Sequence, residues 1–451
     1  MKERIVLFSI IFGLAVFLYV FQNYFNTVLG LLFLCCAMVV YAIYLHLATL
    51  HKKRKLRKNP QLINENYKPF ITVMIPSHNE DGVITKTVEN VLEMDYENFE
   101  IIVIDDRSDD NTANVIRALE EKYEKVTALV RDKESFPGKS AVLNDAMLIA
   151  KGEAILVFDA DARVATDFLS KLIPNLEPAD VGAVQARKVV INKDYNLLTR
   201  CQNNEMTLDT HFQIGRDAIK GAVELRGNGE LIKRSALEDI GGWNNYTITD
   251  DLDMSTQLHI KGWDVRFCPD VVVYEEGIIY LMPLYRQRRR WLEGSIRRYL
   301  EQFGAALNSK EMSLRASLDM TAYISEFIMP IWLLMEIFFQ SFRWATGAAP
   351  KNCVLSSLIM GVAIGVCFTL AARYSLRRYD NHSPLQALKQ AIETSIYIFV
   401  IWFPVVLFIC FKILFCKKDM SWGKTTHGLI LEEEANIKVQ KGLQGAAENN
   451  L

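Results

Sequence analysis

The chain has 451 residues, 50% of them hydrophobic, and a formal net charge of −2 at pH 7. This length predicts two or three domains. With 51 basic and 53 acidic side chains there is no basic excess to neutralise phosphates, which excludes nucleic acid as a main partner. The eight cysteines show neither metal-ligand spacing nor a disulfide framework, so we expect no structural disulfides and a reducing compartment.

The first 58 residues predict two membrane-spanning helices and a basic linker. Apolar runs cover residues 5–21 and 28–50, and each is about long enough to cross a bilayer. The second run follows at once without a small-residue cleavage site, which disfavours a removed signal peptide. It ends in a basic cluster at residues 51–58, which the positive-inside rule keeps in the cytoplasm. We therefore expect a multi-pass protein of the cell membrane whose next domain is cytoplasmic.

Residues 65–310 are the expected cytoplasmic domain, and its first part alternates short β-rich runs with amphipathic stretches. The expected strands cover residues 70–75, 100–104, 126–130 and 154–158, and the expected helices cover residues 81–92, 110–122 and 139–150. This βαβ order predicts an α/β fold with a doubly wound, mainly parallel sheet, flanked by transmembrane helices. Such sheets bind ligands at the carboxyl ends of their strands.

Polar clusters follow these predicted strands. Pro76–Glu80 follows the first strand, Asp105–Asp110 follows the second, and Asp159 and Asp161 follow the fourth. Carboxylates gathered there would repel one another without a cation, and Mg²⁺ or Mn²⁺ is held by one or two carboxylates plus substrate phosphates. Side chains two apart on an extended segment share a face, so Asp159 and Asp161 are the candidate metal ligands. A turn or a helix N-cap is the structural alternative.

A second acidic cluster follows Thr249, at Asp250, Asp251 and Asp253. If these carboxylates lie in the cleft, ordinary solvation cannot satisfy all of them. One could then act as a general base, because burial and like charges raise the pKa of a carboxyl toward neutrality. The alternative is a helix N-terminus, where acidic side chains are favourable, and both interpretations can hold at once.

Three arginines precede a tryptophan in Gln287–Trp291, inside a predicted interfacial helix near residues 284–302. Arginine suits phosphate because its planar fork donates two parallel hydrogen bonds, which predicts a diphosphate held at the membrane surface. The alternative is a basic helix that contacts anionic lipid headgroups. The acidic clusters favour the diphosphate, with Arg290 and Trp291 in the site and Arg288 and Arg289 facing lipid phosphates.

Residues 318–416 form a predicted C-terminal transmembrane region with apolar runs at 318–340, 353–372 and 386–416. Three single crossings would place the tail, residues 417–451, outside the cell. Basic residues predict instead that this tail is cytoplasmic: Lys412, Lys417, Lys418 and Lys424. One segment must therefore be interfacial, re-entrant or doubled, and residues 386–416, interrupted at Pro404, could make two short crossings.

The ordered set of motifs resembles the membrane-bound glycosyltransferases of family 2, which include cellulose, hyaluronan and poly-N-acetylglucosamine synthases. The motifs are Asp106, Asp159-x-Asp161, Thr249-Asp250-Asp251 and Gln287-x-x-Arg290-Trp291, and the match covers about residues 65–300. The resemblance implies a GT-A type fold, a UDP-sugar donor, Mg²⁺ or Mn²⁺, and an inverting transfer of a hexose to a membrane-associated acceptor.

The resemblance also implies roles for individual residues. Asp251 takes the position of the catalytic base, beside Asp250, which stands where the family usually has glutamate. Asp159 and Asp161 hold the metal, and Trp291 forms the acceptor end of the site. The implied donor-binding residues are Pro76, Asn79, Glu80, Asp106, Lys139, Asp159, Gln287 and Arg290. The tail is similar to a gating loop that closes over UDP, through Trp422, Thr425 and His427.

Further segments are similar to the bacterial monoglucosyldiacylglycerol synthases, which move glucose from UDP-glucose to diacylglycerol: residues 227–230, 241–244, 249–253, 275–277, 287–294 and 298–300. This likeness implies glucose as the sugar and a lipid as the acceptor. The alternative is a processive synthase of a β-linked polysaccharide, which needs a channel lined by polar and aromatic side chains; the candidates are Trp332, Glu336, Tyr397 and Trp402. A remote alternative is a membrane protein that binds nucleotide-sugar without transfer, although such a protein needs no base beside its carboxylates.

Overall fold

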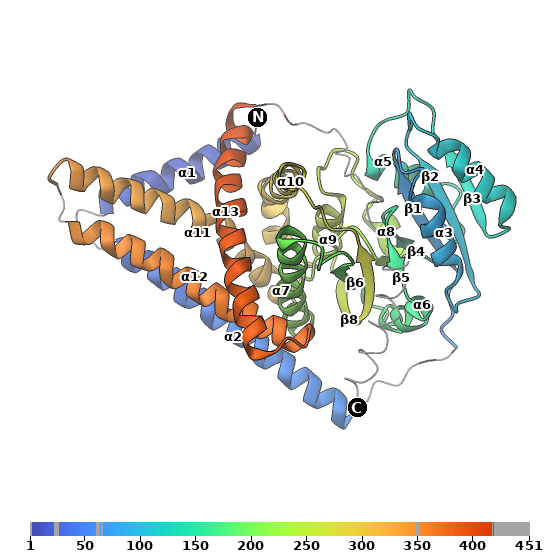
Figure 1. The fold of residues 1–451 in the computed structure, drawn as a ribbon, viewed down its shortest axis with the longest axis horizontal. Helices are drawn as coiled ribbons and strands as arrows, with labels where there is room; N and C mark the ends of the chain where they lie inside the picture. Colours follow the sequence, from blue (N-terminus) through green and yellow to red (C-terminus); the bar gives the residue numbers. More distant parts are fainter. Residues whose placement is uncertain are drawn as a thin grey trace.

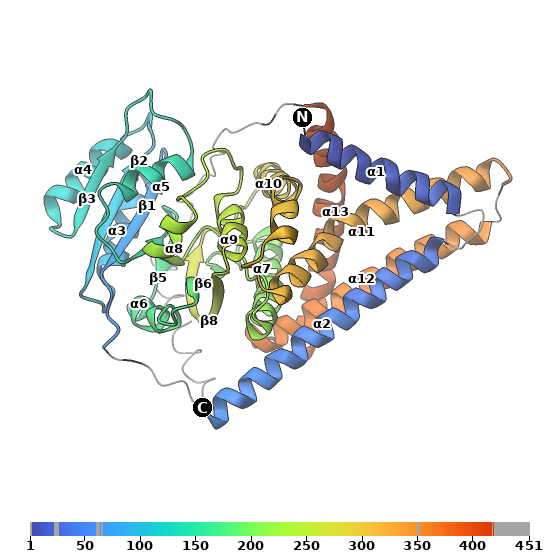
Figure 2. The same ribbon diagram turned by 180° about the vertical axis from the view of Figure 1, so that it is seen from behind.

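The computed structural model describes residues 2–21, 27–59, 64, 66–348, 351–416 and 418. An α/β domain lies beside a group of long helices that come from both ends of the chain (Figures 1 and 2). In Figure 1 the domain is on the right and the long helices extend to the left. These helices are α1 (Lys2–Phe21), α2 (Thr27–Lys58), α11 (Leu314–Ala345) and α12 (Lys351–Tyr379).

One eight-stranded sheet forms the centre of the α/β domain, with the order β3-β2-β1-β4-β7-β6-β8-β5. Strand β1 pairs with β2 and β4, and β2 pairs with β3, all in parallel as predicted. Strand β7 is antiparallel to β4 and β6, and β5 is antiparallel to β8, so the other half is mixed. The strands are β1 (Ile71–Ser77), β2 (Phe99–Asp105), β3 (Val126–Val130), β4 (Ala154–Val157), β5 (Arg163–Val164), β6 (Val181–Val190), β7 (Glu230–Lys233) and β8 (Asp264–Glu275).

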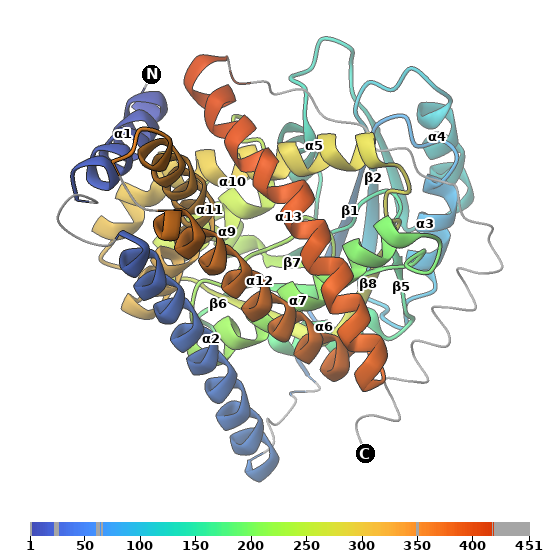
Figure 3. The ribbon, with the colours of Figure 1, turned by 60° about the vertical axis from the view of Figure 1, so that its left-hand side comes forward.

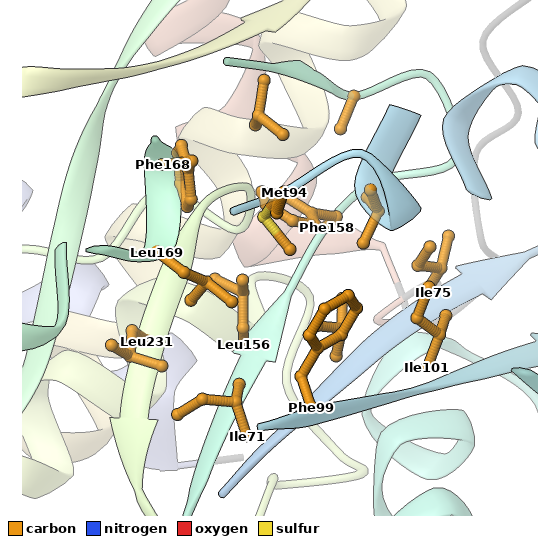
Figure 4. Close-up of a cluster of buried hydrophobic side chains, with 14 of the residues drawn as sticks. Ile71, Ile75, Met94, Phe99, Ile101, Leu156, Phe158, Phe168, Leu169 and Leu231 are labelled. Atoms are coloured by element: carbon orange, nitrogen blue, oxygen red, sulfur yellow. The ribbon is translucent and has the colours of Figure 1, made fainter. Parts of the chain in front are cut away.

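Apolar side chains bind helices to both faces of this sheet. In β1, Ile71 and Ile75 contribute to one core and Met74 to the other, because successive side chains of a strand point to opposite faces. Figure 4 shows the first core, where the rings of Phe158 and Phe168 lie 5.2 Å apart. The covering helices are α3 (Ile84–Leu92), α4 (Thr112–Lys122), α5 (Lys139–Met147), α6 (Phe168–Leu172), α8 (Arg234–Asp239) and α9 (Asp250–Ile260). The two cores hold the strand ends, and the loops that follow them, in fixed positions.

Three more helices lie between the sheet and the long helices: α7 (Leu197–Ile219), α10 (Leu281–Asn308) and α13 (Pro384–Phe415). Helix α10 contains the predicted interfacial segment 284–302. Figure 3 shows α13 crossing in front of the α/β domain. Helix α13 packs on both α7 and α10, so the two ends of the chain and the sheet domain meet along these three helices.

Five of the described helices are long and apolar enough to cross a membrane: α1, α2, α11, α12 and α13. The alternative of two short crossings over residues 386–416 is wrong, because α13 continues through Pro404 as a single helix. A proline removes one helical hydrogen bond, but packing can keep the helix intact. Here Val405 and Val406 are buried directly after the proline, in a cluster with Leu292 and Ile296 of α10.

Candidate active site

A cavity of about 380 Å³ opens at the ends of β1 and β4 and extends to α7, α10, α11 and α13. This volume is within the usual range for small-ligand pockets. The cavity wall brings most of the predicted site residues together: Pro76, Glu80, Lys139, Asp159, Asp161, Asp250, Asp251, Gln287, Arg290 and Trp291.

The cavity has two halves that differ in the elements that build them. The helix half is lined by residues of α7, α10, α11 and α13: Glu205, Met206, Asp209, Thr210, Gln287, Arg288, Arg290, Trp291, Ser295, Tyr323 and Trp402. The loop half is lined mainly by segments at the strand ends and by the loop before α9. It includes Pro76, Glu80, Lys139, Asp159, Asp161, Lys188, Arg226, Gly227, Asp250, Asp251 and Glu275.

Two predicted donor-binding residues lie behind the cavity wall instead of on it. The backbone N–H of Asn79 donates to Oγ of Ser108 at 2.8 Å, which ties the loop after β1 to the loop after β2. Asp106 is fully buried and accepts from Nη1 of Arg131 at 2.6 Å and from the backbone N–H of Gly138 at 3.2 Å. Its carboxylate therefore positions the residue before Lys139, while its contact with a donor stays a prediction.

The three predicted tail residues lie outside the described part of the chain: Trp422, Thr425 and His427. Their role as a gating loop stays a prediction.

Lys139 begins α5 and reaches across the loop half. Its Nζ donates to Oδ1 of Asp159 at 2.7 Å and to the carbonyl oxygen of Gly227 at 2.7 Å. Burial would lower the pKa of Lys139, but the charges of Asp159 and Asp250 outweigh it and raise that pKa. The ammonium of Lys139 therefore stays charged. It lies against the carboxylate of Asp159, which is a predicted donor-binding residue.

The two candidate metal ligands follow β4, and both line the cavity. Oδ2 of Asp161 accepts from the backbone N–H of Glu276 at 2.9 Å, whereas the side chain of Asp159 is 39% exposed. Among the described residues, no group of three His, Cys, Asp or Glu side chains could hold a metal ion alone. Two carboxylates still fit a hard divalent cation whose other ligands are phosphate oxygens and water.

Asp250 and Asp251 start α9, so both interpretations of this acidic cluster are satisfied: it is a helix N-terminus that also faces the cavity. Oδ1 of Asp251 accepts from the backbone N–H of Leu252 at 2.9 Å. Burial, followed by the charge of Asp250, raises the pKa of Asp251 to about 6. A carboxylate with this pKa is mostly ionised at neutral pH and is a stronger base than an exposed aspartate.

Gly227 lies next to the side chains of Asp251 and Lys139. Its φ is +75°, which favours glycine. A β-carbon there would lie 3.4 Å from Oδ2 of Asp251 and 3.6 Å from Nζ of Lys139. Any larger residue would narrow the space between these groups.

Beneath this loop, burial and the nearby aspartates raise the pKa of Glu230 to about 8, so this carboxyl is mainly protonated at neutral pH.

Two arginines of α10 pack against aromatic rings, and the first of them is fully buried. Arg288 is 1% exposed, its Nη2 donates to Oε2 of Glu205 at 2.8 Å, and its guanidinium lies 4.1 Å from the ring centroid of Trp291. The guanidinium of Arg289 lies 3.7 Å from the ring centroid of Phe408 on α13. The prediction that Arg288 faces lipid phosphates is therefore wrong, because its guanidinium is buried against Glu205 of α7. Arg289 is half-buried, and its contact with lipid phosphates stays a prediction.

Other residues of the cavity wall were not predicted as site residues from the sequence. Lys188 of β6 and Glu275 of β8 form a buried ion pair with an Nζ–Oε2 distance of 2.7 Å. On α7, Glu205 and Asp209 lie four residues apart and so share a helix face, which was the only available signal for them. Trp402, an expected channel candidate, lines the helix half.

Residues 69–294, half of the chain, match the family described as "Glycosyltransferase like family 2". The chain belongs to the family 2 glycosyltransferases. The predicted family and enzyme class are thus confirmed.

Two relatives and one solved structure show which known glycosyltransferases this chain is similar to. A β-monoglucosyldiacylglycerol synthase of Trichormus variabilis is 35% identical over 362 residues, which are 80% of this chain and 76% of the relative. A poly-β-1,6-N-acetyl-D-glucosamine synthase of Staphylococcus aureus is 30% identical over 284 residues, 62% of this chain and 68% of that protein. A mannosyltransferase from Pyrobaculum calidifontis, solved with GDP-Man and Mn²⁺, has a TM-score of 0.58 at 21% identity and covers 81% of this chain and 98% of its own. This likeness confirms the predicted GT-A type fold.

Proposed function

We propose that this enzyme transfers glucose from UDP-glucose to the free hydroxyl of diacylglycerol in a membrane. The relative that shares 35% identity over 80% of this chain is a β-monoglucosyldiacylglycerol synthase, which supports both the sugar and the lipid. The decisive structural observation is that one cavity joins the buried base Asp251 to Tyr323 and Trp402, which belong to helices long and apolar enough to cross a membrane. A lipid hydroxyl can thus meet a base at the edge of a bilayer.

Asp251 is the proposed general base. It takes the proton of the acceptor hydroxyl while that oxygen forms a bond to the anomeric carbon. The bond from this carbon to the diphosphate breaks on the opposite face, UDP leaves with the electron pair, and the configuration inverts. Asp250 keeps the pKa of Asp251 raised, because a second carboxylate disfavours its ionisation.

Lys139 and Arg290 are the proposed contacts of the leaving diphosphate. Lys139 is a fixed cation in the loop half, and Arg290 can offer a planar pair of donors to phosphate oxygens. Asp159 and Asp161 would hold Mg²⁺ or Mn²⁺, which when bound offsets the negative charge that develops on the diphosphate. A direct contact of Asp106, Asn79 or the tail with the nucleotide belongs to the same proposal.

For the membrane arrangement we propose that α1, α2, α11 and α12 cross the bilayer and that α13 lies along its cytoplasmic surface. Figure 1 shows α13 running across the direction of the other four helices. An even number of crossings puts the basic end of α2, the α/β domain and the tail on the same side, which agrees with the positive-inside rule. The domains are then residues 1–58, 65–310, 318–416 and 417–451.

A product assay tests this function. Membranes that contain the full-length enzyme are incubated with radiolabelled UDP-glucose and diacylglycerol, then separated into an organic extract and an insoluble residue. We expect label in a glucosylated diacylglycerol in the extract, and none there with the Asp251→Asn variant. Label in an insoluble polymer would establish the polysaccharide alternative instead. Release of UDP without any acceptor product would show that transfer to diacylglycerol is not the reaction.

A further inference from the structure

The helix half contains two carboxylates, each paired with an arginine. Nη2 of Arg288 donates to Oε2 of Glu205 at 2.8 Å. One turn further along α7, Asp209 accepts two hydrogen bonds from Arg226, from Nε at 3.0 Å and from Nη2 at 2.6 Å. Both carboxylates belong to the cavity wall, on the side that α11 and α13 complete. In the proposed reaction, an acceptor that enters through the helix half meets these two pairs.

In each pair, the side chain of the carboxylate is more exposed than the side chain of the arginine. The side chain of Glu205 is 18% exposed and that of Arg288 is 1% exposed. The side chain of Asp209 is 36% exposed and that of Arg226 is 20% exposed. The two ion pairs are neutral in sum, but the surface they present is negative.

Neither arginine is free to turn outward. The guanidinium of Arg288 lies 4.1 Å from the ring centroid of Trp291, and its Nη1 donates to Oε1 of Gln287 at 2.6 Å. Arg226 is held from behind as well, because its Nη1 donates to Oε2 of Glu224 at 2.8 Å. Both cations are thus held in place beside their carboxylates.

Helix α13 holds the first carboxylate in place. Nε1 of Trp402 donates to Oε1 of Glu205 at 3.0 Å, and the hydroxyl of Tyr397 lies 3.2 Å from Oε2. Arg290 is the remaining cation that lines the helix half, and in the proposed reaction the donor diphosphate neutralises it. With donor bound, the wall that an acceptor meets is thus a fixed, negative one.

We propose that Glu205 and Asp209 make this glycosyltransferase select a lipid whose accepting hydroxyl belongs to an uncharged group, and reject a lipid whose hydroxyl lies beside a phosphate. The inference rests on the proposed function and names the acceptor class for that site. A phosphate brought against two fixed carboxylates is repelled, because like charges in a poorly solvated site interact strongly. Diacylglycerol, which has a hydroxyl and no charge, meets no such barrier.

Competition between two acceptors tests the inference. The full-length enzyme in vesicles of phosphatidylcholine receives equal amounts of diacylglycerol and phosphatidylglycerol, whose hydroxyls lie close to a phosphate, and labelled UDP-glucose. Thin-layer chromatography separates the two glucosylated products. We expect Asp209→Asn and Glu205→Gln each to lower the ratio of diacylglycerol to phosphatidylglycerol product by about tenfold. Asp209→Asn is the safer variant for folding, since Arg226 keeps Glu224 as a partner.

Glu393→Gln is the matched control. Glu393 lies on α13, pairs with Arg200 of α7 at 3.3 Å, and is not among the cavity-lining residues. We expect it to keep the wild-type ratio. An unchanged ratio in Asp209→Asn and Glu205→Gln, or an equal change in Glu393→Gln, would overturn the inference while leaving diacylglycerol glucosylation intact. Absence of glucosylated diacylglycerol from the wild-type enzyme would instead overturn the proposed function itself.

Discussion

Both halves of the cavity contain carboxylates, but these carboxylates have different neighbours. In the loop half, burial and then the charge of the neighbouring Asp250 raise the pKa of Asp251 to about 6. In the helix half, Glu205 and Asp209 each have an arginine partner. The family match ends at residue 294, before Tyr323 and Trp402. The loop half and the two carboxylates of α7 thus lie in the shared domain, whereas Tyr323 and Trp402, which complete the helix half, lie on helices beyond it.

In the proposed mechanism the general base, Asp251, belongs to the loop half. Replacing this residue should have the largest effect. We expect Asp251→Asn to lower turnover by about 10²- to 10⁴-fold, because general-base catalysis contributes that much. UDP binding, measured by calorimetry, should remain close to wild type, because the amide has nearly the same shape. Normal turnover by this variant would remove Asp251 from the role of base.

Arg290 lies on the helix that joins the two halves, and its replacement should have the next largest effect. Arg290→Lys keeps the charge but loses the planar pair of donors, so we expect turnover to fall by about 10- to 100-fold. Arg286→Lys is the control and should have little effect, because Arg286 is exposed one turn earlier on the same helix and does not line the cavity. If both variants behave alike in steady-state kinetics, a specific diphosphate contact by Arg290 is ruled out.

Trp402 tests whether α13 shapes the helix half. Trp402→Phe removes the N–H that donates to Glu205, and we expect the KM for diacylglycerol to rise about tenfold while the KM for UDP-glucose stays constant. Trp332→Phe is the matched control, because the buried Nε1 of Trp332 has no hydrogen-bond partner in the described structure. Equal changes in both KM values would mean that the tryptophan serves only general packing.

The pH dependence should give the smallest effect and the clearest view of the loop half. The base must be ionised, so kcat/KM should rise as pH increases through about 6, the pKa of Asp251. Asp250→Asn removes the neighbouring charge that raises this pKa, so the acid limb should move to lower pH. An acid limb that keeps its position in this variant would show that another group controls it.

Local sequence patterns predicted the loop half well. The parallel strands and the polar clusters after them were legible because strand propensity, burial and turn residues act over a few positions. Asp159 and Asp161 were placed at the cavity because parallel strands deliver their carboxyl ends to one edge, whereas the position of Asp251 came from the family resemblance. Asp106 was placed at the right strand end, but its pairing with Arg131 depends on the next loop.

The sequence by itself determined the α/β domain and the apolar helices, because each depends on short-range patterns of polarity. It also supplied the candidate residues of the reaction, through the order of the motifs. Only the tertiary structure decided how the long helices meet that domain. The orientation of Arg288 depends on α7 and α13, which lie about 80 residues before it and about 100 residues after it. Helical periodicity defines a face but not the partner that covers it, so the buried pair of Arg288 and Glu205 could be found only in the folded chain.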